Sequence, residues 1–92
     1  MKSFVYPAVF IKDDKDNSYN VLFPDLQITT DGAFVEEAFL YAKEALRTYF
    51  VYVNKYDLDF NMPTDFDRVK RSCEDRDLVM LIDAGVSSKD TI

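Results

Sequence analysis

Acidic side chains are the residues of this sequence best suited to chemistry. Asp25, Asp31, Glu36 and Glu37 lie within one stretch, FPDLQITTDGAFVEEA, at positions 23–38. Carboxylates bind metal ions and act as general acids and bases. They are also favoured for stability alone near the positive end of a helix dipole. A structural role is therefore favoured over a catalytic one, and an electrostatic contact with a partner is compatible with either.

A second acidic group, DDKDNS at 13–18, has the alternating oxygen ligands that begin a calcium-binding loop. Tyr19 stands where such a loop needs its turn glycine, however, and no glutamate follows at the position of the final bidentate ligand. A solvated hairpin turn is the favoured interpretation, and we expect no metal here.

The other residues of common catalytic sites are scarce. Histidine, the commonest general base and metal ligand, is absent. Cys73 is the single cysteine and has no neighbouring base to activate it, so a thiol nucleophile, an internal disulfide and a zinc site of thiolates from one chain are all disfavoured. Gly32 and Gly85 are the only glycines, too few for a phosphate-binding loop. We expect neither catalysis nor a cofactor.

The charge balance indicates the kind of partner. Lysine and arginine number 11 against 17 acidic residues, a net charge of −6. A phosphate backbone is repelled by such a chain, so a basic partner or a small neutral one is favoured. Arg68, Lys70, Arg71 and Arg76 are interleaved with acids, which is typical of a salt-bridged surface. With neither a signal peptide nor a membrane span in the sequence, we expect a soluble, cytoplasmic protein.

Hydrophobic patterning predicts one α+β domain over residues 1–84, followed by a loose tail at 85–92. Strands are expected at 4–11, 19–23, 28–30 and 78–84, with a helix from 34 to about 54. Pro7 interrupts the first strand, which therefore should lie at a sheet edge or carry a bulge. Its apolar residues on both faces predict a doubly buried strand or an oligomer contact. Thr64 is expected to cap one or two helical turns that extend to Cys73.

The helix has one clear apolar stripe and two outlying apolar residues. The stripe that should face the sheet consists of Val35, Ala38, Phe39, Ala42, Ala45, Leu46, Tyr49, Phe50 and Val53. Leu40 and Val51 fall on the opposite face of the helical wheel, which suggests a contact surface.

The sequence resembles the HicB antitoxin family. The resemblance rests on YPAVF at 6–10, YNVLFPDL at 19–26, EEA at 36–38, AKEAL at 42–46, MPT at 62–64 and VMLID at 79–83. It implies the order β-β-β-α-β, with an antiparallel-rich sheet, one long helix on one face and a partial ribonuclease H-like fold. Two segments depart from the family pattern. Gln27 and Ile28 replace a Pro-Gly pair, and Phe34 replaces a threonine cap, so capping is expected to pass to Asp31.

The resemblance also implies a function. HicB proteins bind and neutralise HicA, a small basic toxin that cleaves messenger RNA, and commonly form dimers or larger oligomers. The first two strands lack the carboxylates that a metal-dependent nuclease of the ribonuclease H fold needs, so a binding scaffold is implied. Only eight residues follow Ala84, so we do not expect DNA binding by this chain alone.

Six residues are candidate contacts with such a toxin: Asp25, Asp31, Glu36, Glu37, Leu40 and Val51. Two alternatives remain open at this point. The chain could be a stand-alone oligomeric HicB-like domain that associates through its apolar first strand, or a weak RNA-binding domain.

Overall fold

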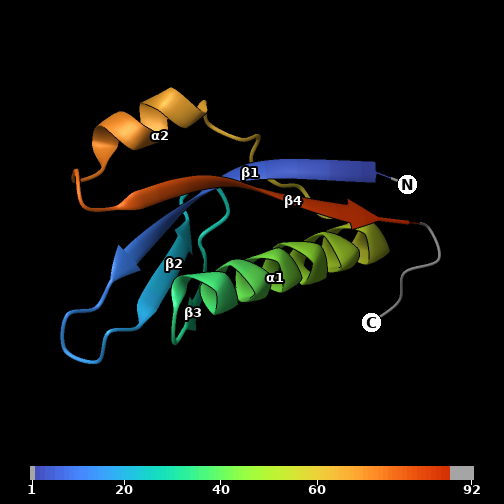
Figure 1. Ribbon diagram of the computed structural model, residues 1–92. Helices are drawn as coiled ribbons and strands as arrows, with labels where there is room; N and C mark the ends of the chain where they lie inside the picture. Colours follow the sequence, from blue (N-terminus) through green and yellow to red (C-terminus); the bar gives the residue numbers. More distant parts are fainter. Residues whose placement is uncertain (1, 88–92) are drawn as a thin grey trace.

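The computed structural model describes residues 2–87 and contains four strands and two helices. In chain order they are β1 (Lys2–Lys12), β2 (Tyr19–Phe23), β3 (Ile28–Gly32), α1 (Val35–Tyr56), α2 (Phe66–Ser72) and β4 (Leu78–Val86). The sheet forms a middle layer, with α1 on one face and the short α2 on the other (Figure 1). The expected α+β class and the β-β-β-α-β order, with the expected short helical turns as α2, are confirmed.

The sheet is antiparallel throughout, in the order β3-β2-β1-β4. The prediction that the first strand lies at an edge or carries a bulge at Pro7 is wrong, because β1 is central and pairs with β4 without interruption from Lys2 to Phe10. Its pairing with β2 begins only at Val9. Pro7 therefore lies on the half of β1 that β2 does not reach, where a missing N–H is tolerated.

Burial on both faces of β1 is confirmed. The five consecutive residues Tyr6–Phe10 are buried. Since alternate side chains point to opposite faces of a sheet, this continuous run means that both faces of β1 are covered there. Tyr6, Ala8 and Phe10 join the core beneath α1. We call the opposite side of the sheet, which α2 covers in part, the open face.

The apolar stripe of α1 packs on the sheet as predicted. Ala38, Ala42, Leu46 and Phe50 are fully buried. The prediction that Val51 faces outward is wrong, since Val51 is 4% exposed and belongs to the main buried cluster. A helical wheel assumes that one stripe of the helix contacts one flat layer. Near the C-terminal end of α1 the buried side chains cover a wider part of the helix surface, which includes Val51.

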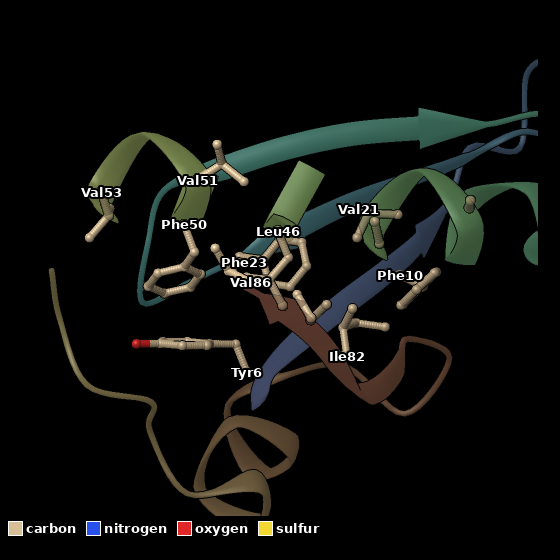
Figure 2. Close-up of a cluster of buried hydrophobic side chains, with 14 residues drawn as sticks. Tyr6, Phe10, Val21, Phe23, Leu46, Phe50, Val51, Val53, Ile82 and Val86 are labelled. Atoms are coloured by element: carbon tan, nitrogen blue, oxygen red, sulfur yellow. The ribbon is translucent and has the colours of Figure 1, made fainter. Parts of the chain in front are cut away.

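Phe50 lies at the centre of an aromatic cluster. Its ring stacks on Phe4 at 3.8 Å between centroids and meets the edge of Phe60 at 5.0 Å. It also lies 5.4 Å from the ring of Tyr6, and Figure 2 shows the two rings facing each other with the Tyr6 hydroxyl at the margin of the cluster. The cluster ties β1 and α1 to the segment after the helix.

Gly32 allows the start of α1 to lie directly against β3. A Cβ atom placed on Gly32 would lie 2.6 Å from the Ala38 Cα and closer still to the Ala38 backbone nitrogen. No side chain fits in that space, so a close approach of two backbones explains the glycine.

Two other boundaries differ from the sequence prediction. β4 continues to Val86, which is buried. The predicted boundary between the domain and its tail, after residue 84, is therefore too early in the sequence. Residues 88–92 of that tail lie outside the described residues. The α2 helix starts after Asp65 with no side-chain cap. The prediction that Thr64 caps it is wrong, because Thr64 hydrogen-bonds to another segment.

Candidate functional site

The four acidic residues of the 23–38 stretch do not form one cluster. Asp25 lies in the turn between β2 and β3, beside Tyr49 and Asn61. Asp31 lies at the other end of β3, opposite Asn20, where α1 begins. The prediction that all four lie near the positive end of the α1 dipole is therefore wrong for Asp25, because the length of β3 separates it from the others.

Asp25 has a structural role that joins distant segments. Its carboxylate accepts hydrogen bonds from the backbone N–H of Thr64, at 2.8 Å, and from the Thr64 hydroxyl. Its backbone carbonyl accepts another from the Asn61 side chain at 3.0 Å. The Tyr6 hydroxyl in turn donates to the Asn61 carbonyl at 2.6 Å. These bonds hold the exit of β2 against the 61–64 segment that leads to α2.

The same contacts affect the acidity of Tyr6. Burial raises the pKa of its hydroxyl above the ordinary value, and the negative charge of Asp25 and the nearby Tyr49 raise it further. Tyr6 therefore stays protonated and keeps donating its hydrogen bond well into the alkaline range.

Replacing Asp25 with asparagine is expected to lower the free energy of unfolding by about 1–2 kcal/mol. An amide keeps one acceptor oxygen but turns an NH2 group toward the Thr64 donors, and hydrogen bonds to charged groups contribute roughly 1.5–3 kcal/mol. Urea denaturation measures the change. Asp31→Asn, at an exposed position, is the control and should change stability by less than about 0.5 kcal/mol. Equal effects of the two substitutions would contradict the role of Asp25.

Glu37 also serves the local structure. Its carboxylate accepts a hydrogen bond from the backbone N–H of Ala33 at 2.9 Å. The residue at the N-cap is Phe34, which makes no side-chain cap, so the prediction that Asp31 caps the helix is wrong. Asp31 belongs to β3 and is exposed. In a capping box the glutamate accepts from the N–H of the N-cap residue. Glu37 accepts from Ala33, one residue before the N-cap, and so fastens the segment that enters the helix to its first turn.

The remaining candidates are exposed on different sides of the point where β3 turns into α1: Asp31 lines the open face of the sheet beside Asn20 and Leu22, and Glu36 and Leu40 are exposed on α1. Leu40 is 61% exposed, and Asp31 and Glu36 are exposed beside it in the chain. Two aromatic residues that the sequence analysis did not select, Phe34 and Tyr41, are also 53% and 44% exposed. One feature of the sequence could have pointed to this surface: Phe34 is an aromatic residue at the position where the HicB pattern has a threonine. We use the name corner surface for five exposed residues that surround this point on more than one side: Asp31, Phe34, Glu36, Leu40 and Tyr41.

The corner surface combines negative charge with large apolar side chains. Apolar and aromatic side chains at the centre of a contact supply binding energy, and charges around them speed encounter and fix orientation. Glu36 and Glu37 also stand in the first turn of α1, where the helix dipole favours them. This arrangement is suited to binding a basic protein surface.

A hollow of about 670 Å³ lies elsewhere, between α2 and the open face. Val9, Ile11 and Leu22 contribute its apolar side, and Cys73 and Arg76 line it opposite. Arg76 is paired with Asp14 at 3.1 Å, and this ion pair raises the pKa of the guanidinium.

The 13–18 turn closes the β1–β2 hairpin through its own hydrogen bonds. The Asp16 carboxylate accepts from both the backbone N–H and the hydroxyl of Ser18, and these bonds lower the pKa of Asp16. Asn17 adopts a left-handed conformation with φ of 60°. Within residues 2–87, no three acidic or cysteine side chains come together so as to hold a metal ion. Across the same residues, no helix is long and apolar enough to cross a membrane.

Comparison with solved structures decides the fold. A chain of a toxin–antitoxin complex from Streptococcus pneumoniae matches with a TM-score of 0.77 and 22% identity, over 99% of this chain and 78% of that one. The antitoxin HicB from Burkholderia pseudomallei matches with a TM-score of 0.80 and 19% identity, over 95% of this chain and 66% of that one. The chain has a HicB-like fold.

The HicB-like fold confirms the resemblance drawn from the short sequence segments. Comparison of the sequence with protein-family models gives no match, and comparison with curated proteins gives none either. At 19–22% identity the similarity establishes the fold, and function has to be argued from the surface.

Proposed function

We propose that this chain is an antitoxin that binds and neutralises a small basic HicA-type toxin that cleaves messenger RNA, with no catalysis of its own. The observation that carries the proposal is the match of nearly the whole chain, 99%, to a chain of a toxin–antitoxin complex. The HicB antitoxin, similar over 95% of this chain, supports it. Because the toxin acts on messenger RNA, we place the protein in the cytoplasm.

Charge supports a basic partner. The chain carries a net charge of −6, and opposite charge on two proteins accelerates their association and orients them. The same charge counts against the alternative of an RNA-binding domain, because a phosphate backbone is repelled.

The corner surface is the proposed place of contact. Asp31, Glu36 and Leu40 from the sequence analysis are exposed there, and Phe34 and Tyr41 add apolar area. Asp25 and Glu37 have hydrogen bonds within the chain, so their contribution to a partner is secondary to their structural one. Val51 is buried and is not part of the proposed contact.

Co-purification from the native host tests this function. The tagged chain should recover a small basic protein in a fixed ratio, identified by mass spectrometry, with the mass of the complex measured by light scattering. Expression of that protein alone should arrest growth and degrade messenger RNA, and co-expression of this chain should restore growth. Recovery of the chain alone, repeated under several growth conditions, would overturn the proposal and favour a stand-alone HicB-like domain.

A further inference from the structure

The two edges of the sheet differ in how they are protected. The β3 edge is short, and its five residues ITTDG include two threonines and an aspartate. The β4 edge is nine residues long, and its sequence LVMLIDAGV has no proline, no lysine and one acid. Proteins guard exposed strand edges with short strands, proline or charged side chains, because unpaired N–H and C=O groups otherwise recruit another strand.

The outer edge of β4 is unpaired within the described chain. β4 is the last strand in the sheet order, and the backbone hydrogen bonds that residues 2–87 form outside their helices and strands do not involve it. In an antiparallel sheet, alternate residues of an edge strand direct both backbone groups outward. The edge therefore offers a series of donors and acceptors to a further strand.

One part of this edge is guarded and the other is apolar. Lys43 from α1 forms an ion pair with Asp83 at 3.4 Å, which places a charged side chain at the later half of the strand. The earlier half, residues 78–82, has no charge. Leu81, 53% exposed, and the half-buried Val79 lie on the open face there, and Leu78 is 41% exposed.

We propose that residues 78–82 of β4 pair antiparallel with the same residues of a second copy of this chain. A two-fold axis at Met80 places Val79 of one copy opposite Leu81 of the other, and the two such pairs form one apolar cluster on the open face. Five paired residues are an ordinary strand length. The pairing stops before Asp83, so the Lys43–Asp83 ion pair stays intact.

Charge favours a second copy over the basic toxin as the occupant. The paired segment is uncharged, so a basic surface finds no complementary charge on it. The acids suited to a basic partner lie on the corner surface, at the start of α1. A strand with the same uncharged, apolar sequence matches both the backbone edge and the side chains.

This proposal moves the oligomer contact from where the sequence placed it. The apolar first strand was the expected site of self-association, but β4 pairs with it from Lys2 to Phe10 and β2 from Val9 to Lys12. The edge of β1 that remains without a strand contains Pro7, which has no N–H to donate. Among the described residues, β4 is the apolar strand whose outer edge has no neighbouring strand along its whole length. The inference does not depend on the antitoxin function, since a stand-alone domain would pair in the same way.

Light scattering over a range of concentrations tests the pairing in the full chain. The wild-type protein is expected to approach twice its mass of 10.7 kDa, and Leu81→Lys is expected to raise the dissociation constant at least about tenfold, because it places a charge in the apolar cluster. Leu40→Lys, the same change at a 61% exposed helix position, should leave the dimer unchanged. Circular dichroism verifies that both variants are folded.

Two further measurements use the wild-type chain alone. Amide hydrogen exchange at 78–82 should slow as concentration rises. Added salt should tighten the dimer, since it screens repulsion between two chains of charge −6, whereas it should weaken binding to a basic toxin. A wild-type chain that stays monomeric, or a dimer that Leu81→Lys leaves intact, would overturn the proposal. So would protection at 78–82 that appears only when a toxin is added.

Discussion

Replacing Phe50 with alanine is expected to lower the free energy of unfolding by about 3–5 kcal/mol, the usual cost of removing a buried phenylalanine. Phe50 is fully buried and contacts the rings of Phe4, Tyr6, Tyr49 and Phe60. Its removal leaves a cavity where β1, α1 and the segment after the helix meet. The total free energy of unfolding of a small domain is about 5–15 kcal/mol. A large fraction of the variant molecules should therefore be unfolded at moderate urea concentration.

Urea denaturation at a single protein concentration measures this change, because dimerisation would otherwise contribute to stability. Tyr52→Ala is the matched control. Tyr52 is 40% exposed and stacks on Tyr56 at 6.1 Å, so its truncation should cost about 1 kcal/mol or less. Similar losses in the two variants would show that the aromatic cluster around Phe50 is not the main support of the fold.

Removing the centre of the corner surface is expected to weaken toxin binding by roughly tenfold to a hundredfold. The variant combines Asp31→Asn, Glu36→Gln and Leu40→Ala, all at exposed positions. Each exposed charge contributes about 0.2–1 kcal/mol in an ion pair, and truncation of a leucine buried in the contact adds about 1 kcal/mol or more. A loss of 1.4 kcal/mol corresponds to about tenfold in affinity. Titration calorimetry with the co-purified toxin measures it.

A control variant matches this change in charge and in apolar area. Asp59→Asn, Asp75→Asn and Leu58→Ala also remove two exposed acids and one leucine, which is 50% exposed. If net charge alone drives association, both variants should lose affinity equally and show the same reduced salt dependence. A loss confined to the first variant would support the corner surface, and unchanged affinity there would exclude it.

Local patterns were enough to predict most of the fold. The 3.6-residue periodicity of α1 identified the residues that pack on the sheet, because one helix covers one flat layer. The same local patterns placed β1 at an edge, since proline usually excludes a central position. They could not show that β2 is too short to reach Pro7.

The candidate site was predicted less completely. Exposure of Leu40 followed from helix periodicity. The hydrogen bonds of Asp25 to Thr64, 39 positions away, could not follow from spacing. The exposure of Phe34 and the hydrogen bond from Ala33 to Glu37 could not follow from it either. The burial of Val51 also depends on contacts beyond the helix itself.

The sequence by itself determined the class of the protein: a small acidic α+β domain with segments that resemble HicB antitoxins. These properties depend on composition, local periodicity and short motifs, which are present in the chain before it folds. Tertiary structure alone decided which acids are free for a partner, because long-range hydrogen bonds engage Asp25. It also decided which apolar strand has an open edge, because strand order depends on pairing between distant segments.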